Sequence, residues 1–167
     1  MQLGPQNASL VVKTYREGVA AKAGHDLVIE VERWDATVDL DAGSVELSAD
    51  SRSLAIRDGV RGLKPLTDKD RGEIRKNIDS KVLGGQPIAF RSNSARVDGG
   101  RITVDGELTM AGTTRPVSAA LQVDASRVTG TIPLTQSEWG IKPYRGLMGA
   151  LKVRDEVEIV IDAPLPG

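Results

Sequence analysis

Residues 101–124 contain two runs in which apolar and polar side chains alternate. From Ile102 to Met110 every second residue is apolar or glycine, and every residue between them is polar. Successive side chains of a strand point to opposite faces of a sheet, so this period of two predicts a half-buried strand rather than a helix. The pattern breaks at residues 111–114, where Gly112 is free to adopt positive φ, and it resumes from Val117 to Val123. We therefore predict a β-hairpin with one apolar face.

Shorter stretches with the same alternation recur along the chain. They are residues 9–15, 26–34 with a continuation to 41, 45–49, 88–97, 127–135 and 156–163. Together with the hairpin they predict about eight or nine antiparallel strands, each with one apolar face. Such a meander has to bury that face, either by closing into a barrel or by folding into a sandwich.

A single helix interrupts this pattern at about residues 67–83. Thr67 is a suitable N-cap, and acidic residues follow it in the first turn. Ile74, Ile78 and Val82 recur every four residues and predict an apolar stripe that packs against the sheet. Gly84-Gly85 and then Pro87 end the helix. The preceding residues, 57–65, are interpreted as a basic loop.

Two interiors are compatible with an eight-stranded barrel, a core filled by side chains and a lumen that holds one small ligand. Several inward positions carry small residues, namely Ala49, Gly106, Ala119 and Gly130. Small side chains leave space for a ligand, but they also relieve crowding or ease strand bending in a filled core. The pattern leaves both readings open.

Composition excludes several classes of function. The chain has 167 residues, enough for one domain, and its 22 basic and 23 acidic residues give a net charge of −1, which does not favour a nucleic-acid binder. It has no cysteine for disulfide or thiolate chemistry and no apolar run long enough to span a bilayer. No signal peptide is visible, so we expect a cytoplasmic protein unless a leader precedes this sequence.

The sequence also offers little for catalysis or metal binding. His25 is the single histidine, and the adjacent Asp26 would point to the opposite face of a strand, so it is poorly placed to orient the imidazole. One histidine without cysteine is a weak metal site. A hydrolase that uses His25 is the least favoured hypothesis; a structural role for His25, or contact with a ligand, is favoured over it.

The sequence resembles the YceI-like family of polyisoprenoid-binding proteins. The most specific segment is DGELTMAGTTRPV at residues 105–117, and matching segments occur in order at 34–54, 73–92 and 139–159. The resemblance covers about residues 9–163, although Ala111 stands where many relatives have histidine. It implies that residues 1–167 form one domain, a closed, lipocalin-like antiparallel barrel of about eight strands with the helix packed against it. It implies no catalysis and no cofactor, a long isoprenoid or fatty lipid as the partner, and the possibility of a homodimer.

Candidate ligand-binding residues follow from these two lines of reasoning. The inner face is expected to contribute Phe90, Gly106, Leu108, Met110, Leu121 and Ile132. The glycine-rich stretch 137–152 contributes Trp139, Tyr144 and Met148, either as packing residues or as the rim of a pocket. Arg115 is interpreted first as a turn residue paired to a local carboxylate and second as a contact for an anionic headgroup. A filled-core barrel that acts as a scaffold or interaction module is the alternative to a lipid binder.

Overall fold

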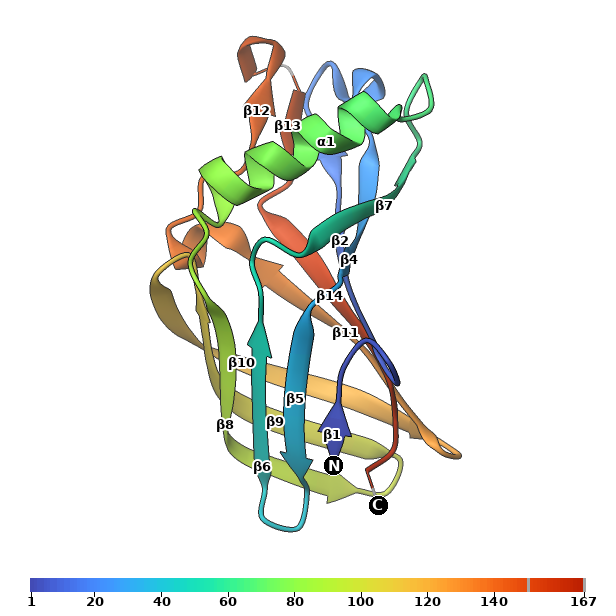
Figure 1. Ribbon diagram of the computed structural model, residues 1–167, viewed down its shortest axis with the longest axis vertical. Helices are drawn as coiled ribbons and strands as arrows, with labels where there is room; N and C mark the ends of the chain where they lie inside the picture. Colours follow the sequence, from blue (N-terminus) through green and yellow to red (C-terminus); the bar gives the residue numbers. More distant parts are fainter. Residues whose placement is uncertain (150, 167) are drawn as a thin grey trace.

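A computed structural model describes residues 1–149 and 151–166, and one large antiparallel sheet organises them (Figure 1). The sheet has 11 strands, and each strand pairs with its neighbours in antiparallel fashion. In order across the sheet the strands are β1 (Gln2–Leu3), β5 (Trp34–Asp39), β6 (Ser44–Ala49), β8 (Ile88–Asp98), β9 (Arg101–Met110), β10 (Thr113–Asp124), β11 (Arg127–Thr135), β14 (Glu156–Pro164), β2 (Ser9–Thr14), β4 (Asp26–Val31) and β7 (Leu54–Val60).

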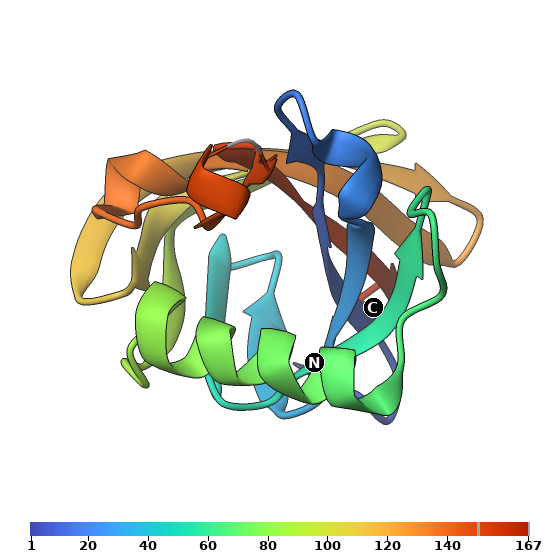
Figure 2. The same ribbon diagram turned by 90° about the horizontal axis from the view of Figure 1, so that it is seen from above.

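The sheet curls strongly but does not form the closed eight-stranded barrel that the sequence predicts. Seen from above, its strands curve round most of a circle (Figure 2). Its order nevertheless runs from β1 at one edge to β7 at the other, with no pairing between these edges in the described residues. The expectation of a clean closed barrel is therefore corrected to a large, curled, open sheet with one helix.

The chain turns a corner between β4, which pairs with one edge strand, and β5, which pairs with the other. The sequence predicts one strand from 26 to 34 with a continuation to 41, whereas the structure ends β4 at Val31 and begins β5 at Trp34. Glu32 N donates to Ser53 O (2.9 Å) and Asp50 N donates to Arg33 O (2.9 Å). These bonds fix the corner to the turn at 50–53, so β5 leaves β4 instead of continuing in line with it.

The hairpin that the sequence predicts at 101–124 is confirmed. β9 and β10 pair from Arg101 opposite Gln122 to Met110 opposite Thr113. The turn consists of two residues, Ala111 (φ +51°) and Gly112 (φ +78°). Positive φ at both central residues is what a type I′ turn requires. β10 therefore begins at Thr113, two residues earlier than the Arg115-Pro116 restart suggested by sequence.

The predicted helix is also confirmed. Helix α1 (Asp68–Asn77) continues into one π-helical turn, Ile78–Val82. Thr67 Oγ1 accepts from Asp70 N (3.1 Å), and the Asp70 carboxylate accepts from Thr67 N (3.0 Å), which forms a capping box. α1 lies across the upper end of the curled sheet (Figures 1 and 2).

Two segments that the sequence predicts to be loops contain strands in the structure. Residues 57–65 were expected to be a basic loop, but β7 extends to Val60 and forms an edge of the sheet. Residues 137–152 include β12 (Arg145–Gly146) and the start of β13 (Leu151–Val153). With β3 (Arg16–Glu17) these strands make a separate three-stranded sheet. No helix in residues 1–149 or 151–166 is both long and apolar enough to cross a membrane.

Buried apolar residues form two clusters. The larger one includes Ile29, Val31, Leu134, Trp139 and other residues from β2, β4, β5, β11 and β14. The smaller cluster consists of Ala95, Ile102, Val104 and Val128, from β8, β9 and β11 near their turns, with partly buried neighbours that include Phe90 and Leu121. Between these clusters the inner face of the sheet borders a cavity.

Candidate ligand-binding site

An elongated apolar cavity lies inside the curled sheet under α1. Its volume is about 680 Å³, within the range of about 300–1,000 Å³ that is usual for small-molecule sites. Residues from nine strands of the large sheet line it, because the period-two alternation places every second side chain on this face. Strand residues in the lining include Leu10, Val12, Leu27, Ile29, Val45, Leu47, Ala49, Ile88, Phe90, Val104, Leu108, Met110, Val117, Ala119, Leu121, Ile132, Leu134, Val157, Ile159 and Ile161.

The partial burial of side chains along β10 indicates the same cavity. Its inward residues Val117, Ala119 and Leu121 are only half-buried, although they face the interior of the sheet. Residues in a filled core would be fully buried, because close packing leaves few voids larger than a water molecule. These side chains instead border open space. The filled-core reading of the barrel is therefore not supported by the structure.

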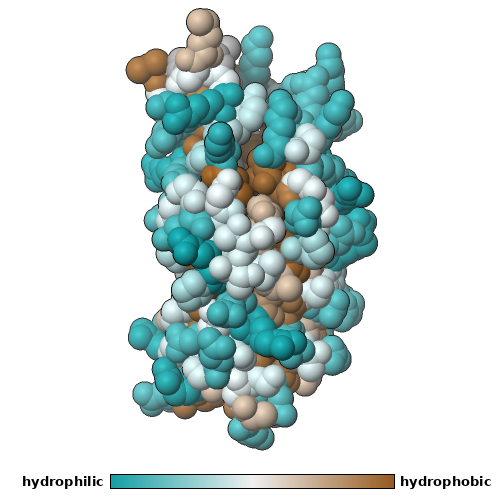
Figure 3. Space-filling model, turned by 90° about the vertical axis from the view of Figure 1, so that its left-hand side faces the viewer, coloured by the Kyte–Doolittle hydropathy of each residue, from teal (hydrophilic) through white to brown (hydrophobic). Residues whose placement is uncertain are grey.

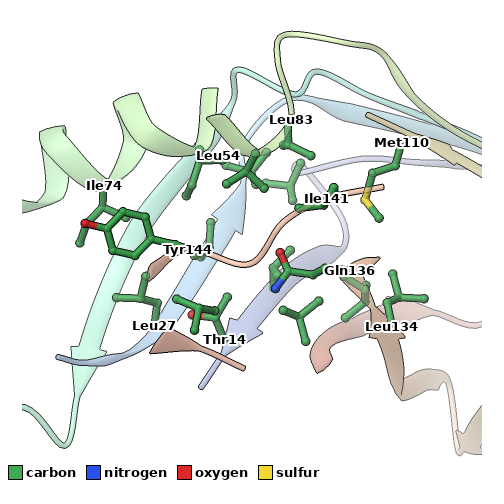
Figure 4. A pocket seen from close by; sticks show the side chains of 18 of the residues that line it. Thr14, Leu27, Leu54, Ile74, Leu83, Met110, Leu134, Gln136, Ile141 and Tyr144 are labelled. Atoms are coloured by element: carbon green, nitrogen blue, oxygen red, sulfur yellow. The ribbon is translucent and has the colours of Figure 1, made fainter. Parts of the chain in front are cut away.

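The helix covers the cavity from above. Ile74, Ile78 and Val82, the predicted apolar stripe, all line it together with Leu83, and Ile74 points from α1 toward Tyr144 in Figure 4. The stripe therefore faces the cavity as well as the sheet. In the space-filling view, apolar surface is visible in a recess between hydrophilic side chains (Figure 3).

Charged side chains gather at the upper end of the lining. Arg16, Lys64, Lys152, Asp70 and Glu73 are all among the lining residues, and they come from β3, β13, α1 and the segment before the helix. Both signs of charge are present. This end has the polar character of a mouth, whereas the opposite end adjoins the smaller apolar cluster, from which Val104 and the neighbouring Phe90 and Leu121 line the cavity.

Seven of the eleven predicted ligand-binding residues line the cavity. They are His25, Phe90, Leu108, Met110, Leu121, Ile132 and Tyr144. Tyr144 is 42% exposed, and its ring lies between α1 and the cavity (Figure 4), so it takes the rim position that was one of its two readings. Ligand contact by these residues stays a prediction.

The other four predicted residues lie outside the lining. Trp139 is 2% exposed and its Nε1 donates to Leu108 O (2.9 Å), which is the packing role. Met148 is fully exposed, at 106%. Arg115 is exposed and its Nε donates to the backbone O of Glu138 (3.0 Å), a local contact to a carbonyl rather than to the expected carboxylate.

The position of Gly106 has no room for a side chain, because neighbouring backbone lies close to it. A Cβ placed on Gly106 would lie 2.3 Å from Arg91 O and 2.6 Å from the Phe90 ring. This close approach coincides with an irregularity in the pairing of β8 with β9 between Ser92 and Ser94. Of the two readings of the small residues, Gly106 therefore fits relief of crowding. At Gly130 a Cβ would lie 2.3 Å from the end of the Leu121 side chain. Ala49 and Ala119 do border the cavity.

His25 and Asp26 have separate partners. The imidazole Nε2 of His25 contacts the backbone O of Lys64. Asp26 is buried, and its carboxylate accepts from Arg16 N (2.9 Å) and pairs with Arg61 Nη1 (3.0 Å) and Arg16 Nη1 (3.4 Å). The carboxylate is thus engaged by two arginines. Within the described residues, no three His, Cys, Asp or Glu residues are grouped to hold a metal ion.

Ile141 and Gln136 are among the lining residues that sequence reasoning missed. Ile141 lies in the irregular stretch after β11, where no periodicity marks its direction. Gln136 follows Ile132 and Leu134 at intervals of two, so the alternation could have placed it inward. Its polarity concealed it, because a pattern search for apolar residues ends at Leu134.

Comparisons with known proteins agree with this architecture. Residues 6–165 match the model of the YceI-like domain. The crystal structure of BcnA from Burkholderia cenocepacia is similar, with a TM-score of 0.68, 16% identity and coverage of 95% of this chain and 96% of that one. The YceI protein of Campylobacter jejuni has a TM-score of 0.57, 10% identity and coverage of 82% and 84%. At these identities the likeness concerns the fold. No curated protein matches the sequence.

Proposed function

This chain belongs to the YceI-like family, and from that premise we propose that it binds, carries or sequesters a long apolar lipid of isoprenoid-like shape inside its curled sheet. The observation that carries the proposal is the cavity of about 680 Å³ with aliphatic walls. One end is apolar, and its polar mouth lies beneath α1. This shape suits a molecule with a long hydrocarbon tail.

Hydrocarbon burial supplies the affinity in this proposal. Each buried CH₂ group contributes about 0.8 kcal/mol. A solvent-exposed ion pair at the mouth contributes about 0–1 kcal/mol. One five-carbon isoprenoid unit therefore outweighs a headgroup contact at Lys64 or Lys152. We expect selection mainly by the length and shape of the tail.

We propose a binding role rather than an enzymatic one. The geometry around His25 supports this choice, since its imidazole contacts a backbone carbonyl while Asp26 is held by arginines. An esterase activity that disappears in His25→Ala would contradict the proposal.

Two neighbouring alanines on β10 provide a matched test. Ala119 lines the cavity, and Ala120 is exposed on the outer face. Ala119→Leu adds bulk to the cavity and is expected to reduce lipid uptake with little loss of stability, because the empty space accommodates the side chain. Ala120→Leu adds the same bulk outside and should leave uptake unchanged.

Native mass spectrometry of purified protein, before and after lipid extraction and reloading, measures the uptake. We expect wild type and Ala120→Leu to take up a polyprenyl or fatty chain and Ala119→Leu to take up much less. A wild-type protein that takes up no such chain would refute the lipid-binding function. The same spectra give the oligomeric state and so test the predicted possibility of a homodimer.

A further inference from the structure

Gln136 is a buried polar side chain in the wall of an otherwise aliphatic part of the cavity. It is 8% exposed and directly follows the last residue of β11, at the upper end of that strand. Leu134 and Ile141 are its neighbours in the lining, and its carboxamide extends toward the middle of the cavity in Figure 4. A polar group in such surroundings is costly unless it forms a hydrogen bond.

The orientation of the carboxamide is fixed by one hydrogen bond. Gln136 Nε2 donates to the backbone O of Arg154 (3.1 Å). A carbonyl oxygen only accepts, so the nitrogen of the amide has to face Arg154 and the oxygen has to face away. No hydrogen bond to Gln136 Oε1 occurs among residues 1–149 and 151–166, and this oxygen is not one of their fully buried unpaired polar atoms, so it borders open space. The cavity therefore contains a pre-oriented acceptor.

The position of Gln136 along the cavity sets the direction of a bound chain. At the apolar end, the cavity is lined by Val104 of the smaller apolar cluster and by that cluster's partly buried neighbours Phe90 and Leu121. Thr14, Tyr144 and the charged mouth lie toward the other end, beside β3 and α1. A ligand with its tail at the apolar end would place its polar end near Gln136.

We propose that Gln136 Oε1 accepts a hydrogen bond from the ligand, so that the preferred ligand is an uncharged long-chain lipid with a donor group, such as an alcohol. This inference rests on the proposed lipid-binding function and narrows its ligand class. A carboxylate or fully ionised phosphate offers no donor to Oε1. A terminal hydroxyl supplies a donor and allows the hydrocarbon to fill the remaining space.

A matched pair of ligands tests the proposal in the wild-type protein. The probes are geranylgeraniol and its methyl ether, which share one tail and one oxygen, but in the ether a methyl group replaces the donor hydrogen. Their affinities are measured by displacement of the apolar fluorophore N-phenyl-1-naphthylamine from delipidated protein. We expect the alcohol to bind about tenfold more tightly, which corresponds to the roughly 1.4 kcal/mol typical of one hydrogen bond.

A variant pair assigns the preference to Gln136. Gln136→Met retains the length of the side chain and removes the amide, so the alcohol-to-ether affinity ratio should fall about tenfold while the ether binds as before. Gln122→Met makes the same change on the exposed outer face of β10 and should leave the ratio unchanged.

The outcomes separate this inference from the function on which it rests. Equal or tighter binding of the ether in wild type overturns the role of Gln136, and so does an unchanged ratio in folded Gln136→Met. If Gln136→Met does not fold, the wild-type ligand pair decides. Failure of both probes and of a polyprenyl chain to bind refutes lipid binding itself.

Discussion

The two tryptophans are both buried, but only one of them has a partner for its indole N–H. Trp139 Nε1 donates to Leu108 O (2.9 Å), which joins the segment after β11 to β9 beside the cavity. Trp34 Nε1 is buried without a hydrogen-bond partner in the described part of the chain. At the scale of single residues, the same side chain thus has two different energetic roles.

Trp139→Phe is expected to destabilise the protein by about 1 kcal/mol beyond the effect of its smaller ring, because it removes the hydrogen bond to the Leu108 carbonyl. Urea denaturation gives the free energy of unfolding. Trp34→Phe is the matched control: it removes a similar volume but no hydrogen bond, so its cost should be smaller. Equal losses in the two variants would contradict the proposed importance of the Trp139 bond.

Ala111 occupies the left-handed region at φ +51° in the β9–β10 turn. A non-glycine residue there is strained by about 1–2 kcal/mol, and glycine is not. Ala111→Gly should therefore raise the unfolding free energy by up to about 1 kcal/mol, after allowance for the extra freedom of glycine in the unfolded chain. The thermal midpoint measures it. A lower midpoint would show that the lost methyl contacts outweigh the strain.

Helix α1 is the element that separates the cavity from solvent above it. Its apolar stripe of Ile74, Ile78 and Val82 lines the cavity, and its start is fixed by the capping box between Thr67 and Asp70. This apolar stripe is therefore buried against a cavity rather than against a filled core. The stability of this helix and ligand exchange should therefore be linked.

Thr67→Ala removes the N-cap and is expected to cost about 1 kcal/mol of stability. It should also speed the release of a bound apolar fluorophore, because the first turn of the cover frays more often. Stopped-flow release and hydrogen exchange of residues 68–77 measure the two effects. Lys69→Ala, in the same exposed turn, should change stability by less than about 0.5 kcal/mol. Equal release rates for Thr67→Ala and wild type would contradict the proposed link between fraying of the first turn of α1 and ligand release.

Low pH is expected to destabilise the first turn of α1. Hydrogen bonds from the backbone N–H and side chain of Thr67 lower the pKa of Asp70 below its ordinary value of 3.8. The folded state thus favours the carboxylate, so this contribution is present above the unfolded pKa and is lost as pH falls through the lower folded pKa. Thermal midpoints of wild type and Asp70→Asn, compared from neutral pH to about pH 2, should converge in acid. A difference between the two thermal midpoints that stays constant over that pH range would contradict this linkage.

The whole molecule combines an open, curled sheet with an internal cavity, and this gives it a stability that depends on occupancy. A ligand that binds only the folded state adds about 2.7 kcal/mol at a free concentration of 100 times Kd. For a chain of this size, that corresponds to a rise of roughly 5–10 °C in the thermal midpoint.

Calorimetry of delipidated protein with and without saturating geranylgeraniol measures this rise. The Ala119→Leu variant should show a smaller rise, because its cavity holds less lipid. A midpoint that is identical with and without the lipid, at concentrations shown to load wild type, would mean that the lipid does not bind the folded state in preference to the unfolded state.

Sequence predicted much of the local structure and part of the site. Alternation at 101–124 predicted both strands of the hairpin. The i, i+4 spacing of Ile74, Ile78 and Val82 predicted the inner face of the helix. β7 was missed because the apolar alternation at Leu54 and Ile56 gives way to charged residues and glycine. Gln136 was missed because it is polar, although it lies in phase with its inward neighbours.

Period-two alternation by itself determined that the chain is mainly β and which side chains face inward, since strand geometry makes direction a local property. Only tertiary structure decided what those side chains meet. Gly106 faces backbone and the Phe90 ring, whereas Ala119 faces open space, and nothing in their own sequence neighbourhoods distinguishes them. The cavity and the open edge between β1 and β7 depend on how strands distant in sequence pair and how far the sheet curls. Those are properties of the assembled sheet, because they arise from contacts between segments that the local pattern does not relate.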